Sequence, residues 1–179
     1  MNLPHPSFAT LGPIMQLAFV PQDFDAALRY WTEHVGAGPF FMLDHVKVEG
    51  AKYKGAPTDI DFSMALGYWG DMQIELIRQH NDAPSIYKAW SDAGKEGIHH
   101  VCIVVDDLQQ ARAVSDRAGA TIVQEGNVPG GGVIYVDPGK QAGMLIELVK
   151  LPQEVLRGFA WMREQAKGWD GRDPIRRLG

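Results

Sequence analysis

The alternation of apolar and polar residues predicts a buried strand near the middle of the chain, over residues 99–105. Successive side chains of a strand point to opposite faces of the sheet. Val101, Ile103 and Val105 therefore form one uniformly apolar face, which suits packing under a helix. The first residue of the opposite face is His100, whose imidazole can bind a metal or transfer a proton. One face of this strand is therefore expected to belong to the core, and the other to carry a candidate functional residue.

Similar patterns predict four helices and seven further strands. Apolar residues at helical spacing follow Asp23 and Asp25 and predict a helix over about 24–35, and Asp107 is placed to cap another that ends at Gly119. A short helix over 85–93 and a helix after Pro152 complete the helical set. The expected strands cover residues 14–20, 40–48, 59–67, 72–78, 99–105, 121–124, 133–136 and 144–149. Residues 49–58 are expected to form a loop, and the end of the chain is polar and rich in arginine.

These elements form an internal repeat of strand, capped helix and three strands. Residues 16–20 resemble 100–104, and residues 72–77 resemble 144–149 more closely still. The repeat predicts an α+β fold of two tandem βαβββ modules. The expected divisions are an N-terminal arm (1–13), a first module (14–82), a linker helix (83–97), a second module (98–150) and a C-terminal helix and tail (151–179).

Four polar residues lie at equivalent places in this repeat. Gln16 corresponds to His100, and Glu75 corresponds to Glu147. Strand parity places all four on the surface opposite the helices. A carboxylate among isoleucine and leucine on a central strand is costly unless it is paired or coordinated. The alternative is a polar core network in which His100 bridges the two glutamates, whereas His99, of opposite parity, is expected to be structural or exposed.

The chemistry of these four side chains suits a divalent metal ion. Three oxygen donors and one imidazole are typical ligands of hard or borderline ions. Two carboxylates balance a 2+ charge, because Gln16 and a neutral His100 add none. The donor set leaves zinc, nickel, cobalt, manganese and iron open.

Composition restricts the remaining possibilities. The chain has 179 residues, enough for one domain or two small modules that share a core. A net charge of -5 provides no basic surface for nucleic acid, and no apolar run is long enough to span a membrane. Residues 1–13 lack the features of a signal peptide, and Cys102 is the only cysteine, so we expect a cytoplasmic protein without disulfides.

The sequence resembles the vicinal oxygen chelate superfamily, which includes glyoxalases, bleomycin resistance proteins and extradiol dioxygenases. The resemblance covers roughly residues 14–150 and is most specific over 85–101 and 144–148. Those segments are similar to methylmalonyl-CoA epimerases, which have a Ser-Pro-Ile helix before a Gly-Leu-His-His strand. The resemblance implies a curved mixed sheet around one cavity. It also implies that the metal ligands are Gln16, Glu75, His100 and Glu147.

The ligand order departs from the epimerase pattern. Epimerases normally have histidine where this chain has Gln16, and an amide where it has Glu75. The order Gln, Glu, His, Glu instead resembles glyoxalase I, although the arginines with which that enzyme recognises glutathione have no counterpart here. The expected metal ligands therefore resemble those of glyoxalase I, whereas the surrounding sequence resembles the epimerases. The function has to be inferred from the site and not from the fold.

Both relatives imply proton transfer alpha to a carbonyl through a metal-stabilised enolate. We therefore expect a lyase or isomerase acting on a small molecule such as a thioester or hemithioacetal. Glu147 and Glu75 are the candidate bases, and Asp61, near an acidic position of the epimerases, is a third. The alternatives are a ring-cleaving Fe(II) dioxygenase, which would need two histidines, and a non-catalytic binding protein.

Relatives often form dimers, and the apolar residues Phe159, Trp161 and Met162 of the tail helix favour a homodimer.

Overall fold

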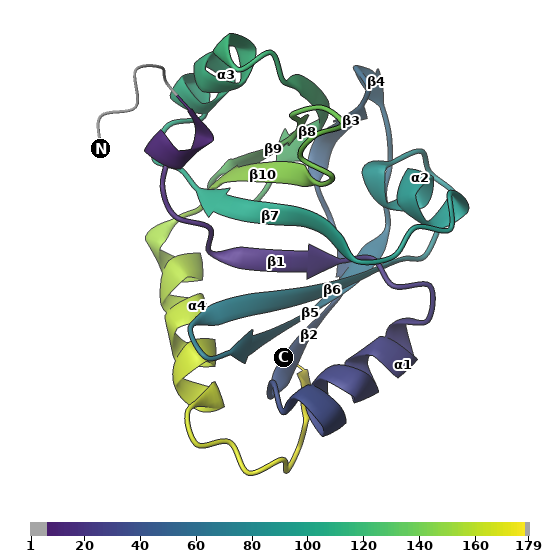
Figure 1. Cartoon of the computed structure of the whole chain (residues 1–179), viewed down its shortest axis with the longest axis vertical. Helices are drawn as coiled ribbons and strands as arrows, with labels where there is room; N and C mark the ends of the chain where they lie inside the picture. The colour runs from purple at the N-terminus through teal and green to yellow at the C-terminus, as the bar shows by residue number, and fades with distance from the viewer. Residues whose placement is uncertain (1–6, 178–179) are drawn as a thin grey trace.

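The computed structural model describes residues 7–177 (Figure 1). Within this range the strands form one curved, unclosed mixed sheet in the order β11-β2-β5-β6-β1-β7-β10-β9-β8-β3-β4. The strands are β1 Gln16–Phe19, β2 Phe40–Val46, β3 Glu49–Tyr53, β4 Ala56–Pro57, β5 Phe62–Trp69, β6 Met72–Gln79, β7 Ile98–Val104, β8 Thr121–Asn127, β9 Gly132–Asp137, β10 Leu145–Lys150 and β11 Ile175–Arg177. The expected α+β fold with a curved mixed sheet is confirmed.

The first strands of the two halves meet at the centre of this sheet. β1 pairs antiparallel with β7, while each is parallel to the last strand of its own half, β6 and β10 respectively. The remaining strands of each half then extend outward on their own side, β5 and β2 in one direction and β9 and β8 in the other. The strands that correspond in the sequence repeat therefore occupy corresponding places in the two halves of the sheet. The first and last strands of both halves lie side by side in the order β6-β1-β7-β10.

Two capped helices cover the outer face of the sheet. α1 (Phe24–Arg29) continues as a π-helical segment (Tyr30–Val35), and Asp23 caps its start by accepting a hydrogen bond from the backbone N–H of Ala26 at 2.9 Å. Asp107 caps α3 (Leu108–Arg117) in the same way. Each helix packs on the apolar face of its own half, so the helix-facing parity expected for these strands is confirmed.

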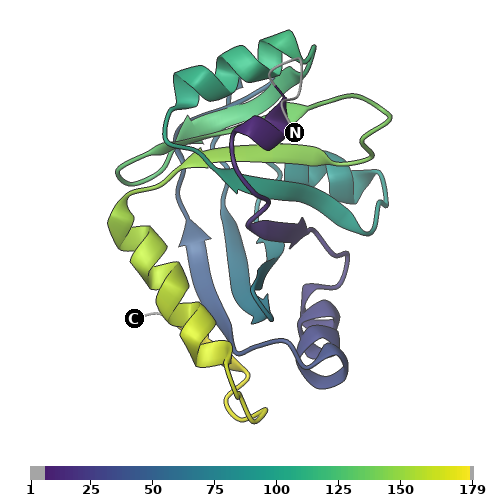
Figure 2. The ribbon, with the colours of Figure 1, turned by 60° about the vertical axis from the view of Figure 1, so that its left-hand side comes forward.

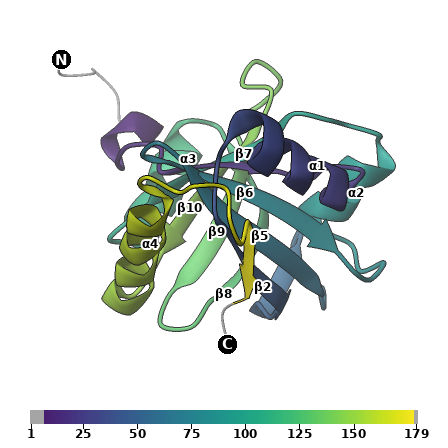
Figure 3. The same ribbon diagram turned by 90° about the horizontal axis from the view of Figure 1, so that it is seen from below.

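The segment expected to be a loop over 49–58 is a hairpin instead. Its strands β3 and β4 pair with each other, and β3 also pairs with β8, at the far edge of the second half. The polar end of the chain likewise contains β11, which pairs with β2 (Figure 3). β3, β4 and β11 are short and mostly exposed strands, and such strands lack the apolar alternation by which a strand is recognised.

Two further helices lie at different places around the sheet. α2 (Ile86–Asp92) precedes β7, and α4 (Gln153–Ala166) follows β10. α4 runs beside the strands of the first half (Figure 2), where Met162 is buried against Phe41, Leu66 and Tyr68. No helix within residues 7–177 combines the length and the apolar character needed to cross a membrane.

Candidate metal centre

Glu75, His100 and Glu147 converge on the concave side of the sheet. His100 Nε2 lies 3.0 Å from a carboxylate oxygen of Glu147 and 3.4 Å from one of Glu75. The His100 side chain is fully buried, and those of Glu75 and Glu147 are only 8% and 12% exposed. Ala18 on β1 is in register with both Glu75 on β6 and His100 on β7. Because its side chain is a single methyl group, the two larger side chains can meet above it.

Gln16 lies two residues before Ala18 and on the same face of β1. It lines the same cavity as Glu75 and Glu147, and its Nε2 donates to Oε1 of Gln73 at 2.8 Å. The structure thus brings three of the four expected ligands into direct contact. It places the fourth on the wall of their cavity.

The hydrogen bonds behind Gln16 determine how its amide is turned. Nε2 of Gln73 donates to the hydroxyl of Tyr68 at 2.9 Å, and that hydroxyl donates to the backbone carbonyl of Phe159 in α4 at 3.1 Å. The carbonyl of Phe159 can only accept a hydrogen bond. The Tyr68 hydroxyl must therefore donate to it, and the side-chain amides of Gln73 and Gln16 must each donate to the next group in the series. Gln16 therefore directs its NH₂ group to Gln73, and its acceptor oxygen is left for another partner.

A second hydrogen-bonded chain orients His100. His99 Nε2 lies 3.3 Å from the carbonyl of Ile86, and the Nδ1 atoms of His99 and His100 are 2.8 Å apart. The carbonyl requires the proton of His99 on Nε2, so His99 Nδ1 accepts from His100 Nδ1–H. Burial lowers the pKa of His99 to about 3, which keeps it neutral. Nε2 of His100 consequently faces the two glutamates, as in a metal-binding imidazole held by an outer partner.

The electrostatics of the three central residues favour a cation between them. Burial acts to lower the pKa of His100, but hydrogen bonds to Glu147 and Glu75 raise it to about 9. Burial raises the pKa of Glu75. Without a metal, an imidazolium bridges the two carboxylates, which is the polar network expected as the alternative. A divalent ion fits the same residues, because it would replace one proton and balance two carboxylates.

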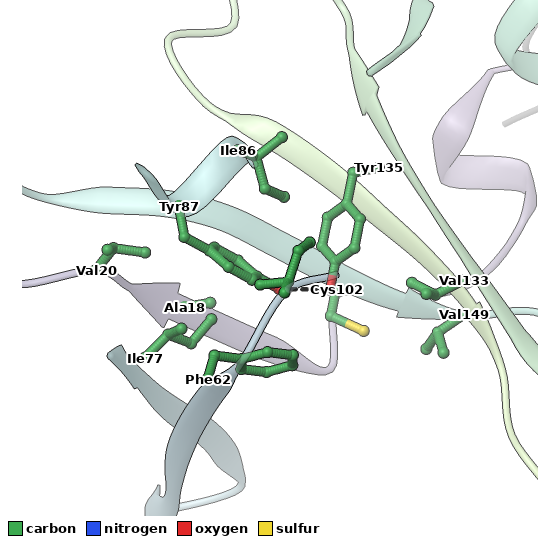
Figure 4. Packing of buried hydrophobic residues seen from close by; sticks show 11 residues of the cluster. Ala18, Val20, Phe62, Ile77, Ile86, Tyr87, Cys102, Val133, Tyr135 and Val149 are labelled. Carbon is green, nitrogen blue, oxygen red and sulfur yellow. Dashed lines mark hydrogen bonds between the residues drawn. The ribbon is translucent and has the colours of Figure 1, made fainter. Parts of the chain in front are cut away.

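The surrounding cavity is about 440 Å³ in volume and mostly apolar. Figure 4 shows Tyr87 and Tyr135 within the apolar cluster that forms its wall, their hydroxyls 3.0 Å apart. Burial raises the pKa of both phenols and of the Cys102 thiol well above their usual values, so all three are neutral. Val155 and Phe159 of α4 also line this space. The carboxylates therefore face a mostly apolar cavity.

Asp61 lies elsewhere. Its carboxylate is 2.8 Å from Nδ1 of His45, which lowers the pKa of Asp61 through the hydrogen bond. The neighbouring His80 donates to or accepts from Ser63 at 2.7 Å. His45, Asp61 and His80 form a separate and more exposed group, and none of them lines the cavity of Glu75 and Glu147. The geometry therefore gives no support to Asp61 as a base for that cavity.

Comparison with known families fits this architecture. Residues 15–136 match the Glyoxalase/Bleomycin resistance protein/Dioxygenase superfamily. The chain belongs to this superfamily. The expected resemblance is thereby confirmed over more than half of the sequence, and the superfamily is the one whose members typically use divalent metals. No curated protein matches the chain.

Several solved structures share the fold at low sequence identity. A methylmalonyl-CoA epimerase from Mycobacterium tuberculosis is 19% identical, with a TM-score of 0.55 over 87% of this chain and 97% of that one. A hypothetical protein from Bacillus halodurans C-125 is 16% identical, with a TM-score of 0.56 over 78% and 94%. A methylmalonyl-CoA epimerase from Streptomyces coelicolor, in complex with 2-nitronate-propionyl-CoA, is 18% identical, with a TM-score of 0.51 over 78% and 94%.

Several residues of the site escaped the sequence analysis. Gln73 has the same strand parity as Glu75, so alternation alone could have placed it on the concave face. Tyr68 and the carbonyl of Phe159 could not have been found in this way, because only the packing of α4 on β5 brings them together. The contact of His99 with His100 also depends on side-chain rotation that strand parity does not describe.

Proposed function

We propose that this protein is a metal-dependent lyase or isomerase that moves a proton alpha to a carbonyl group. The observation that carries the proposal is the placement of two buried carboxylates on one imidazole nitrogen inside an apolar cavity. Gln16, Glu75, His100 and Glu147 are the residues proposed to hold the ion. When bound, a divalent ion acts as a Lewis acid on a carbonyl oxygen and makes the adjacent C–H more acidic.

The protein supplies the base for this reaction. A general base works best when its pKa lies near the operating pH. Burial raises the pKa of Glu75 toward that range, and Glu147 shares the same partner. Either carboxylate could accept the proton and return it, so both remain base candidates. The neutral phenols of Tyr87 and Tyr135 add a polar but uncharged wall.

The substrate proposed is a small carbonyl compound such as a thioester or a hemithioacetal. A mostly apolar cavity of about 440 Å³ suits the acyl portion of such a molecule. A methylmalonyl-CoA epimerase that is 18% identical to this chain is described in complex with methylmalonyl-CoA, which makes acyl-CoA thioesters the first compounds to test here. The fold alone does not choose between them and hemithioacetals.

The ligand set is less suited to the dioxygenase alternative. Non-haem Fe(II) oxygenases use two histidines and one carboxylate, whereas the central group here contains one histidine and two glutamates. A purely binding protein would have no need for two carboxylates buried at the floor of its cavity, where their desolvation is costly. The chemistry of the central residues therefore favours proton transfer.

Exchange of substrate hydrogen with solvent deuterium tests the proposal directly. Metal-loaded protein would be incubated in D₂O with methylmalonyl-CoA, and separately with a hemithioacetal, and deuterium at the alpha carbon followed by mass spectrometry. We expect exchange that depends on the metal. Absence of exchange with both compounds, together with oxygen uptake in the presence of a catechol and Fe(II), would replace this proposal with the dioxygenase.

A further inference from the structure

A second cavity, of about 490 Å³, lies beside α2 and shares no lining residue with the cavity of the metal centre. Its walls come from the β3–β4 hairpin, from α2 and the turn after it, from the loop between β9 and β10, and from His99, Val123 and Leu145 on β7, β8 and β10. These segments are far apart in the sequence. The pairing of β3 with β8 places Tyr53 and Lys54 of the hairpin in the wall of this cavity.

Three lysines line this cavity, each from a different segment: Lys54, Lys95 and Lys140. No carboxylate of residues 7–177 lies within 4.0 Å of any of their ammonium groups, whereas Lys88 and Lys167 each have a close acidic partner. Asp137 is the single acidic residue in the lining. The cavity therefore carries a net positive charge in a chain whose formal charge is -5. Like charges gathered in one concave site attract an anion.

The aromatic residues of the cavity lie close to these cations. Lys95 Nζ is 5.2 Å from the centre of the Trp90 ring, and Lys54 Nζ is 5.1 Å from that of Tyr53. The indole N–H of Trp90 is buried and has no acceptor among the described residues. That N–H is inaccessible, so it is the face of the ring and the cation beside it that the cavity offers. The cavity thus combines cationic groups with two aromatic rings.

We propose that this cavity binds a phosphate ester that carries a planar ring, as a nucleotide does. Lysine ammonium groups bind phosphate as point charges, and the rings of Trp90 and Tyr53 offer surfaces for a base. A free nucleotide and the nucleotide end of a coenzyme A thioester present this same chemistry. The test of this site is independent of the proposed reaction, because binding of a nucleotide requires neither the metal nor turnover.

Calorimetric titration of the full chain with ADP tests this site, with adenosine and inorganic pyrophosphate as separate probes. We expect ADP to bind more tightly than either part, and to bind more weakly as salt is raised. The variant K54Q/K95Q/K140Q should bind ADP at least about tenfold more weakly, because three charge-assisted contacts are removed. Lys150, an exposed lysine at the end of β10 and outside the cavity, provides the matched control K150Q, which should bind as the wild type does.

Competition identifies the natural source of the phosphate. If coenzyme A binds and ADP displaces it, the cavity holds the nucleotide end of a thioester; if ADP binds and coenzyme A does not compete, it holds a free nucleotide. Absence of binding by ADP and coenzyme A alike would overturn the proposal. Equal loss of binding in K150Q and in the triple variant would also overturn it, since the attraction would then be general surface charge. Circular dichroism of each variant confirms that the fold is retained.

Discussion

The Nδ1 atoms of His99 and His100 lie 2.8 Å apart, although the two residues are consecutive on β7 and start toward opposite faces of the sheet. Both rings are buried. Only one proton can occupy the space between the two nitrogens. Because His99 donates its own proton from Nε2 to the carbonyl of Ile86, the proton between the rings belongs to His100. A residue outside the central group thereby holds Nε2 of His100 toward Glu75 and Glu147.

Replacing His99 with phenylalanine should weaken metal binding without removing a proposed ligand. The variant takes away the acceptor for His100 Nδ1–H, so the imidazole loses its fixed orientation. Loss of such an outer partner typically costs about 10–100-fold in metal affinity. The measurement is the Kd for Zn²⁺ or Co²⁺ by calorimetry. His99→Asn keeps a side-chain acceptor and should recover part of the affinity, whereas equal affinity in wild type and His99→Phe would show that His99 does not position the ligand.

Metal affinity should rise steeply with pH. In the metal-free protein, hydrogen bonds to Glu147 and Glu75 outweigh burial and hold the pKa of His100 at about 9. An incoming ion must displace that proton, so below pH 9 the apparent affinity should increase about tenfold for each pH unit. Calorimetry in buffers of different ionisation enthalpy should detect about one proton released per ion at pH 7. An affinity that stays constant between pH 6 and 8 would contradict a metal site that contains His100.

Glu147→Gln should abolish most of the proton exchange at the substrate's alpha carbon. A positioned base typically contributes about 10²–10⁴-fold in rate, and glutamine cannot accept the proton. The metal content of the variant has to be measured in parallel, and the comparison made at full metal loading. Glu125→Gln is the matched control, because Glu125 pairs with Arg112 and Lys52 and does not line the cavity of the metal centre. Unchanged exchange in fully loaded Glu147→Gln would leave Glu75 as the base.

Local patterns were sufficient to predict the strands that build the site and the faces on which its central residues lie. Alternation places Glu75, His100 and Glu147 on one surface, and the repeat indicates that their strands are equivalent. Parity gives no distances, however. It could not separate Asp61 from the cavity. Asp61 is hydrogen-bonded to His45 instead, and His45 adopts a left-handed backbone conformation at an irregularity in β2 that alternation does not describe. Likewise, no sequence pattern shows that the β3–β4 hairpin pairs with the opposite half.

A homodimer remains a prediction. Fewer apolar residues of α4 are available for an interface than the sequence indicated. Met162 is buried against the protein's own sheet, and Phe159 lines the metal-centre cavity. Trp161 is still 48% exposed, with its ring 5.1 Å from that of Phe41. Light scattering should give twice the mass of one chain, and Trp161→Glu should shift the population toward monomer if this surface forms the interface. A wild-type mass of one chain at all concentrations would refute the dimer.

The hydrogen-bonded chain from Gln16 to α4 makes a prediction about a residue outside the cavity lining. Tyr68→Phe removes the hydroxyl that joins Gln73 to the carbonyl of Phe159. Gln73 then loses the acceptor that fixes its amide, so Gln16 is free to turn its NH₂ group toward the glutamates. We expect weaker metal binding and, because buried polar groups lose their partners, a free energy of unfolding lower by about 1–3 kcal/mol.

Two measurements separate these effects. Denaturant unfolding reports the stability, while the visible spectrum of the Co²⁺-loaded protein reports the ligands around the ion, which a purely structural change in α4 would leave unaltered. Tyr30→Phe is the matched control, because Tyr30 is 58% exposed and should change neither quantity. A Tyr68→Phe variant with lower stability but an unchanged spectrum and metal Kd would show that α4 stabilises the fold without orienting Gln16. A change in both would place Tyr68 and Gln73 among the residues that position the metal ligands, and would connect the packing of α4 to the centre that it covers.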